Sequence, residues 1–180
     1  MRQIALVAGI VVCLAAFGWG QEETEGEPEG FEFIIGPRVG VSYTLMTPEE
    51  YTEYVHKLFP EGNYYPITTI FGVTFEQRIL LGQTRSHFAF QELILVNGLE
   101  QSIALPFGAL FIGYRDKSGF EVGVGPILTM AGIGVVGAIG WTLSFRGVFV
   151  PIDFNFILPS GQRSAAVGLT TGFNFKVRRR

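Results

Sequence analysis

From residue 31 onward, large apolar side chains recur at every second position of the chain. A period of two is that of a β-strand, whose successive side chains point to opposite faces. In the first run Phe33, Val39 and Val41 share one parity, whereas Gly36 and Arg38 share the other. The pattern predicts eight strands, at about 31–45, 65–80, 86–97, 102–115, 119–129, 133–145, 147–158 and 165–177.

Turn-forming residues separate these runs, among them Asn97-Gly98, Arg146-Gly147 and Pro159-Ser160-Gly161. Short connections of this kind favour antiparallel pairing of consecutive strands. An even number of strands also returns the end of the last strand to the side on which the first one begins. The sequence therefore predicts an all-β, up-and-down meander of eight strands over residues 31–177 that closes into a barrel.

The small face of each run carries most of the charge, and this decides which face we expect inside. Charged groups that faced lipid would each be unfavourable, by roughly 2 to 4 kcal/mol for Lys or Arg at the bilayer midplane. The charged and amide residues with the parity of the small residues are Glu32, Arg38, Glu76, Arg78, Glu121, Arg146, Asp153, Asn155, Asn174 and Lys176. We expect them to pair in a narrow lumen, where their role would be structural, while the bulky side chains face hydrocarbon.

One alternative and one exception concern the same patterns. A soluble, calycin-like barrel would alternate similarly with its apolar face inward, but its outer face would then have few Lys and Glu residues. The run at 86–97 departs from the rule, because Phe88 and Phe90 share parity with Glu92, and a β-bulge would have to reset the register there.

The composition also favours a membrane: the chain is 48% hydrophobic and 16% charged, and it contains 24 glycines. Residues 122–145 have no charge, so a membrane helix is the rival interpretation, although glycines and alternation favour strands. An aromatic girdle is expected near one rim of such a barrel. Its predicted members are Phe31, Phe33, Phe75, Phe88, Phe111, Phe120, Phe145, Phe173 and Phe175.

The ends of the chain suggest export. Residues 1–20 have a basic start at Arg2, an apolar run and glycines before Gln21, which is typical of a cleaved signal peptide; an uncleaved anchor is the alternative. The single cysteine, Cys13, lies in that run, so the mature chain would have no thiol. Residues 21–30 form an acidic linker and 178–180 a basic tail, and a net charge of −3 gives no indication of nucleic-acid binding.

The last predicted strand contains Thr170, Gly172, Phe175 and Val177 in the order polar, glycine, hydrophobic, hydrophobic. This order resembles the signal by which the barrel-assembly machinery recognises its substrates. Residues 31–177 as a whole resemble the small eight-stranded bacterial outer-membrane barrels, such as the transmembrane domain of outer membrane protein A. The resemblance implies a transmembrane barrel in the outer membrane of a Gram-negative-type bacterium. It also implies contact with membrane lipid, lipopolysaccharide, periplasmic chaperones and the assembly machinery.

The first and longest connection contains the one helical signal. Thr47, Pro48 and Glu50 form an N-cap, a proline at the first helical position and a capping-box acid. The helix that follows has an apolar stripe, consisting of Tyr51, Tyr54, Val55, Leu58 and Phe59. We expect this short helix outside the cell, either as a lid on the barrel mouth or as a contact for a ligand or lipid surface.

Catalysis has little support, because His56 and His87 are the only histidines and have no ligand spacing for zinc. We therefore expect no enzyme, no metal and no cofactor. The favoured function is a structural or surface-binding barrel with a lumen filled by side chains. A small-solute channel is the first alternative and a lipid-modifying enzyme a lesser one, while the oligomeric state stays open.

Overall fold

The structure, a computed structural model, describes residues 31–81, 86–159 and 164–177. Its strands are β1 (Phe31–Thr44), β2 (Ile67–Leu80), β3 (His87–Asn97), β4 (Leu105–Arg115), β5 (Phe120–Thr129), β6 (Gly132–Phe145), β7 (Val148–Ile157), β8 (Ala166–Gly172) and β9 (Asn174–Lys176). The expected signal peptide at 1–20, linker at 21–30 and tail at 178–180 lie outside the described residues.

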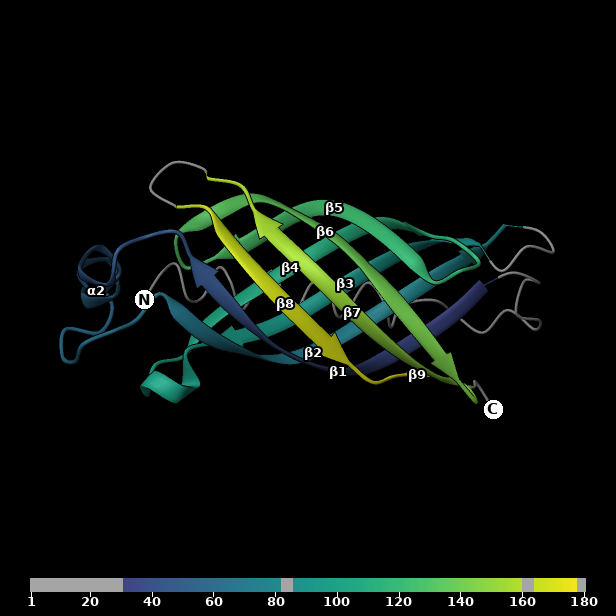
Figure 1. Ribbon diagram of the computed structural model, residues 1–180, viewed down its shortest axis with the longest axis horizontal. Helices are drawn as coiled ribbons and strands as arrows, with labels where there is room; N and C mark the ends of the chain where they lie inside the picture. Colours follow the sequence, from purple (N-terminus) through teal and green to yellow (C-terminus); the bar gives the residue numbers. More distant parts are fainter. Residues whose placement is uncertain (1–30, 82–85, 160–163, 178–180) are drawn as a thin grey trace, which may run out of the picture.

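Each strand from β1 to β7 pairs antiparallel with the strand that follows it in the chain, and β8 pairs with β1, which closes the sheet. The short β9 continues β8, since both pair with β7 and β1. Because β8 and β9 share one position in the sheet, the nine labelled strands form an eight-stranded barrel (Figure 1). This confirms the predicted closed, antiparallel, eight-stranded barrel, which has no unpaired edge strand.

Two helical segments lie at the same end of the barrel (Figure 1). Helix α2 (Pro48–His56) has the predicted capping box at Thr47, and the turn η1 (Leu99–Gln101) lies between β3 and β4. We call this the α2 end; the connections from β1 to β2, β3 to β4, β5 to β6 and β7 to β8 lie there. The opposite, turn end holds the start of β1 and the end of β9.

Residues 122–145 belong to β5, β6 and the turn between them, so the rival interpretation of a membrane helix is wrong. Within the described residues, no helix is long and apolar enough to span a bilayer.

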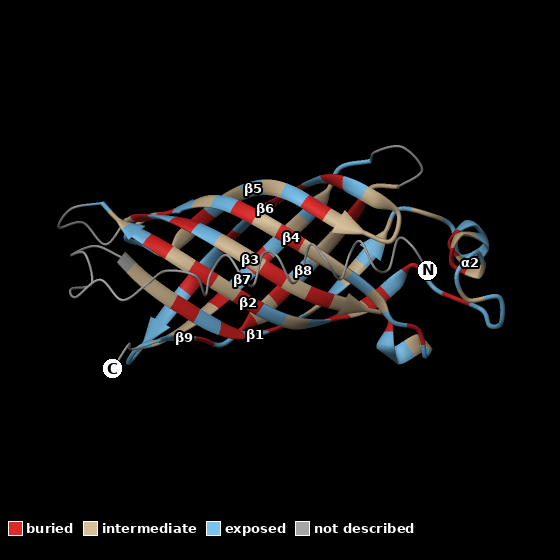
Figure 2. Ribbon diagram, turned by 180° about the vertical axis from the view of Figure 1, so that it is seen from behind, coloured by how far each residue is buried: buried red, intermediate tan, exposed pale blue. Residues whose placement is uncertain are grey.

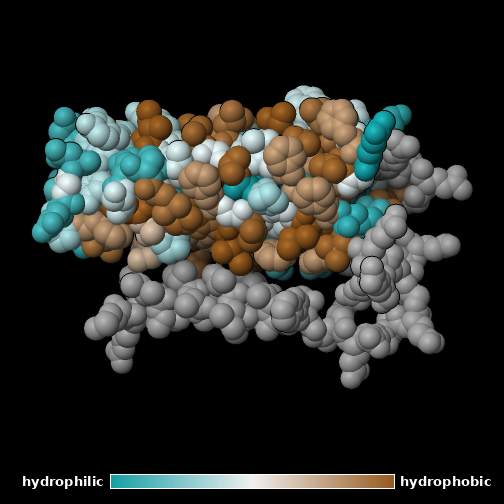
Figure 3. Space-filling view, turned by 90° about the horizontal axis from the view of Figure 1, so that it is seen from below, coloured by the Kyte–Doolittle hydropathy of each residue, from teal (hydrophilic) through white to brown (hydrophobic). Residues whose placement is uncertain are grey.

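Bulky apolar side chains cover the outside of the barrel. Buried and exposed residues alternate along the strands in Figure 2, and Figure 3 shows apolar surface over the middle of the barrel and hydrophilic surface at the α2 end. Among the outward side chains are Val39, Val41, Phe71, Phe88, Ile112, Val124, Ile139, Trp141, Phe154 and Leu169. Such an apolar belt is the surface that a membrane-spanning barrel presents to lipid.

Aromatic residues gather near the turn end, as edge-to-face pairs of Phe88 with Tyr114 and of Phe120 with Trp141. The predicted girdle was wrong at Phe111, which points inward and is buried. Its strand β4 carries large residues on both faces, so alternation alone did not identify the inner one.

The interior is divided along the barrel axis. The half nearest the α2 end holds a buried apolar cluster, formed by Ile70, Leu93, Leu95, Ala109, Phe111, Ile127 and Val136. The half nearest the turn end holds charged side chains. The expectation that only small and ionised residues line the lumen is therefore wrong for the first half, because β3 and β4 turn bulky residues inward.

Glu92 faces outward. The pairing of β3 with β2 and β4 runs without interruption from His87 to Asn97, so the β-bulge proposed for this run is absent. Glu92 lies at the middle of β3, opposite Phe75 and Leu110, and its carboxylate has no hydrogen bond or ion pair with a described residue. A charge on the apolar belt weakens insertion into lipid.

We predict that replacing Glu92 with leucine raises the free energy of unfolding in lipid vesicles by about 1 to 2 kcal/mol, because a carboxylate leaves the lipid-facing surface. Urea titration followed by the fluorescence of the outward Trp141 measures this. The isosteric variant Glu92→Gln should recover part of the gain. Lower stability in both variants would contradict an outward, unpaired carboxylate.

Candidate functional site

Glu76 is the centre of the charged half of the lumen. It lies on β2, is fully buried, and accepts hydrogen bonds from Arg78 Nε and from Arg115 Nη1, the latter at 3.0 Å. Gln91, its cross-strand partner on β3, donates to its second oxygen at 3.3 Å. A buried carboxylate with this many donors is held in its ionised form and in one rotamer.

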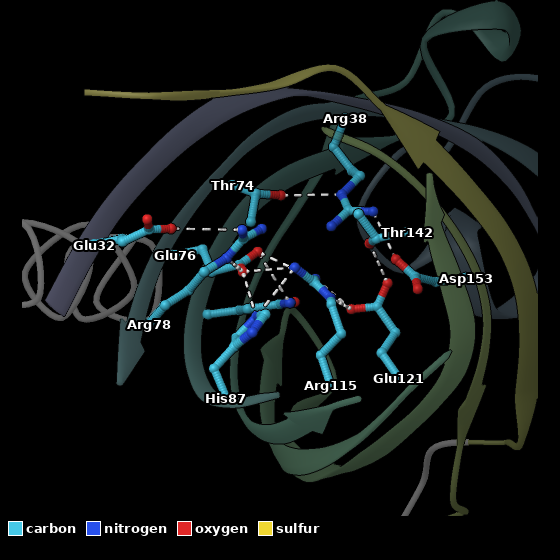
Figure 4. Close-up of polar contacts among 11 residues, drawn as sticks. Glu32, Arg38, Thr74, Glu76, Arg78, His87, Arg115, Glu121, Thr142 and Asp153 are labelled. Carbon is cyan, nitrogen blue, oxygen red and sulfur yellow. Dashed lines mark hydrogen bonds and ion pairs between the residues drawn. The ribbon is translucent and has the colours of Figure 1, made fainter. Parts of the chain in front are cut away.

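Arg115 on β4 connects Glu76 on β2 with Glu121 on β5 (Figure 4). It ends β4, and the register places it opposite His87 on β3 and Glu121 on β5. Its Nε donates to Glu121 Oε2 at 3.0 Å, and Nη2 donates to the same oxygen. Thr142 on β6 donates to the other oxygen of Glu121 at 2.6 Å. One guanidinium therefore binds two carboxylates from two different strands, β2 and β5.

A second ion pair lies nearer the middle of the barrel. Arg38 on β1 donates from Nη1 to Asp153 Oδ2 at 2.6 Å and from Nε to Thr74 at 3.1 Å. Gly140 on β6 lies opposite both Glu121 and Asp153 in the register. A Cβ on Gly140 would come within 2.3 Å of Asp153 Oδ1, so the glycine provides the space that this carboxylate occupies.

The network becomes more exposed toward the turn end. Arg78 lies over the ring of Phe149 at 4.2 Å, and its Nη1 is 3.9 Å from Glu32. Lys176 donates to Glu32 at 3.1 Å, with 39% of its side chain exposed. An ion pair this exposed contributes little to stability.

Among the described residues, three buried carboxylates face three buried guanidinium groups: Glu76, Glu121 and Asp153 with Arg38, Arg78 and Arg115. The set is neutral overall, and each of the six side chains forms an ion pair with an N–O distance of 4.0 Å or less. Removal of one partner of a buried pair leaves an uncompensated charge, which is strongly destabilising.

The predicted lumen residues do not all join this network. Asn155 donates to Thr170 at 2.9 Å beside it, and Asn174 is buried near Gly36, whose missing side chain leaves space for the asparagine. Arg146 is a correction: it lies in the exposed turn between β6 and β7 with φ of 47°, outside the lumen. Arg146 has the parity of the inward residues of β6, but β6 ends one residue earlier, at Phe145.

Sequence reasoning missed Arg115, His87 and Gln91. All three lie on β3 and β4, the strands whose inner and outer faces are both apolar over much of their length. Arg115 shares the parity of Gly113, so the rule applied elsewhere would have identified it.

The residues of the expected assembly signal span the junction of β8 and β9. Thr170 is buried in the lumen and Gly172 packs against β1, whereas Phe175 points outward and Val177 follows the last strand. Recognition by the assembly machinery stays a prediction.

Helix α2 packs on the β3–β4 connection at the barrel mouth. Tyr51 and Val55 are buried with Tyr64 and Ile103, whereas Leu58 is 44% exposed. Tyr54 and Phe59, also on the predicted apolar stripe, pack at the edge of this cluster. Gln101 holds the arrangement together by accepting from the backbone of Tyr65 at 2.7 Å and donating to its carbonyl at 3.0 Å.

Tyr51 has a perturbed hydroxyl. Burial raises its pKa to about 12, with smaller contributions from Tyr54 and from the carboxylate of Glu100. The hydroxyl is therefore neutral throughout the physiological range.

A cavity of about 150 Å³ lies between α2 and the apolar cluster of the lumen. Tyr51, Tyr54 and Met46 line it at the α2 end, and Phe111 and Ile127 line it deeper in the barrel. A second cavity of about 30 Å³ lies further in, next to Arg38, Arg115 and Asp153. No group of three or more potential metal ligands occurs in the described part of the chain.

No protein-family model matches the chain, and no curated protein matches its sequence. Among solved structures, a de novo designed transmembrane β-barrel matches with a TM-score of 0.42 and 12% identity, over 86% of this chain and 100% of the other. Ail, the attachment invasion locus protein of Yersinia pestis, matches with a TM-score of 0.46 and 8% identity, over 82% and 99%. An acetoacetate decarboxylase-like enzyme from Sphingomonas wittichii has a TM-score of 0.21 and 9% identity, over 86% and 95%.

Closure, strand number and the apolar outer surface place the chain in the class of eight-stranded barrels of the outer-membrane type. At these identities and TM-scores, none of the three structures conveys an activity to it.

We predict that Arg115→Gln lowers the free energy of unfolding by about 3 to 5 kcal/mol, because Glu76 and Glu121 lose their shared cation. The matched control is Arg146→Gln in the exposed turn, with an expected change within about 0.5 kcal/mol. Urea titration in vesicles measures both.

A second substitution separates loss of charge compensation from loss of packing. In the double variant Arg115→Gln/Glu121→Gln, one of the uncompensated carboxylates is neutral, so part of the stability should return. Additive losses in the double variant would contradict the ion-pair explanation.

Proposed function

We propose that this chain is a closed outer-membrane barrel with a structural or surface-binding role, located in the outer membrane of a Gram-negative-type bacterium. The observation that carries the proposal is the buried polar network, to which every strand from β1 to β7 contributes a side chain. The apolar belt supports insertion in a bilayer. Contacts with lipopolysaccharide, periplasmic chaperones and the assembly machinery belong to the same proposal.

The network argues against conduction for a steric and an electrostatic reason. Eight strands enclose a lumen that side chains can fill. The cavity that lies next to the network measures about 30 Å³, which leaves room for only a few water molecules. Ions would also have to break hydrogen-bonded ion pairs in order to pass.

The surface-binding role belongs to the α2 end. Helix α2 and η1 project from the barrel there. The buried cluster around Val55 packs α2 against Ile103 of the β3–β4 connection, and Gln101 of η1 hydrogen-bonds to the backbone of Tyr65 and Ile67. The turn end offers short connections between β4 and β5 and between β6 and β7. A rigid projection of this kind can present a constant surface to a partner.

We expect the purified barrel to remain silent in planar lipid bilayers under an applied voltage. Truncation of the plug in Glu76→Ala/Arg115→Ala should produce measurable current, because it removes the two side chains at the centre of the charged network. Single-channel recording measures both. Stable conductance steps of the unaltered protein would defeat the closed-barrel proposal and favour the small-solute channel.

The matched control for this experiment is a double truncation of outward residues on the same two strands, Val73→Ala/Ile112→Ala. It should stay as silent as the unaltered protein. Folding of each variant is checked by heat-modifiable migration on a detergent gel before recording.

A further inference from the structure

The cavity at the α2 end is chemically distinct from the charged network. Among the described residues, its lining contains no Asp, Glu, Lys, Arg or His. Its inner wall is the apolar cluster that includes Leu93, Leu95 and Phe111, and its roof includes Tyr51 and Tyr54 from α2. A plugged barrel does not need such a space, because a cavity inside a packed core lowers stability.

We propose that this cavity binds a small uncharged amphiphile, an alcohol with a short alkyl chain or a single aromatic ring, with the apolar part held in the lumen below α2. This inference deepens the proposed surface-binding role and rests on it. Three features of the cavity carry it: volume, the arrangement of polar atoms and the charge of the mouth.

The volume limits the apolar part of the ligand. The cavity measures about 150 Å³. An engineered protein cavity of about 150 Å³, lined by Leu, Ile and Phe, stays dry and binds benzene. The same residue types form the inner wall here. A ring or a chain of roughly six carbons therefore matches the available space, whereas the acyl chains of a lipid are too long to be enclosed.

Polar atoms form a partial ring around the apolar wall. Ser42, Thr44, Asn97 and Thr129 line the cavity, and the Asn97 Oδ1 atom is buried with no hydrogen-bond partner among the described residues. A buried acceptor without a partner is unfavourable, and a hydroxyl group can donate to it. An alcohol would satisfy this oxygen, whereas a plain hydrocarbon would not.

Charge at the mouth selects against anions. The described connections at the α2 end carry one lysine, Lys57, and five glutamates: Glu49, Glu50, Glu53, Glu61 and Glu100. Thr69 and Gln101 hydrogen-bond to Glu100 and, against the opposing effect of burial, hold its pKa below the usual value. A carboxylate ligand would therefore approach a rim whose described residues are mostly acidic, and then enter a cavity that no described cationic side chain lines.

The test uses the full barrel in lipid nanodiscs and follows the methyl NMR signals of Leu93, Leu95 and Ile127 during titration with hexanol. We expect saturable shifts of these lumen methyls. Hexanoate and hexylammonium should each bind at least about tenfold more weakly than hexanol. Either charge must be desolvated in a cavity that no described charged side chain lines.

A matched pair of variants on β4 locates the site. Ala109 is buried and lines the cavity, whereas Leu110 is its outward neighbour. Ala109→Phe fills the cavity and should abolish saturation, while Leu110→Phe should leave the affinity for hexanol unchanged. In case the first variant does not fold, Leu95→Ala enlarges the cavity and should shift the preference from hexanol to octanol.

Several outcomes would overturn the inference. Shifts that do not saturate and that appear equally at outward methyls such as Ile112 would show partition into the bilayer only. Equal affinity for hexanoate would refute the selection by charge, and unchanged binding in Ala109→Phe would place the alcohol elsewhere. A barrel that is silent in bilayers but binds no hexanol would overturn the cavity site alone, whereas a conducting barrel would overturn the proposed function.

Discussion

A closed ladder of eight strands leaves each side chain with two directions, outward to the apolar belt or inward to a narrow lumen, and the rest of the structure follows from this restriction. Closure satisfies the backbone hydrogen bonds, so no strand needs a partner beyond the barrel. Charged side chains that turn inward meet one another at short range, and only a balanced set can be buried there. Arg115 shows the consequence, because its single guanidinium on β4 binds Glu76 on β2 and Glu121 on the neighbouring strand β5.

The lumen has two halves because the inner face changes character along the strands. On β2, Ile70 lies in the apolar half near the α2 end and Glu76 in the charged half near the turn end. On β4, Phe107 lies in the apolar half and Arg115 in the charged half. Charges that gather in one half can neutralise one another, while apolar residues in the other half exclude water from around them. The arrangement separates a rigid, closed segment from a segment that contains the larger cavity.

The sequence predicted the fold well because alternation, turn residues and strand number depend on local patterns. It also identified the helix, since the capping box at Thr47 is a local signal. The interior was harder to predict. Leu93 and Phe111 point inward on strands whose faces are both apolar, Glu92 points outward without a bulge, and Arg146 lies just past a strand end. Parity shows which residues share a face, but the partners of Arg115 and Asp153 depend on register and on barrel closure.

The division of the lumen also determines where a ligand can act. A molecule that enters from the turn end meets the ion pairs of Arg78 and Glu76, which it would have to break. From the α2 end it meets Tyr51, whose hydroxyl stays neutral, and then an apolar wall. A stable lumen must be filled, whereas a binding site needs free space. The charged half near the turn end is filled by ion pairs, and the apolar half near the α2 end contains the cavity. Polar residues deep in the cavity would improve neither the stability of the barrel nor the binding of an apolar group. This gives a physical reason for the apolar inner face of β3 and β4 next to the cavity.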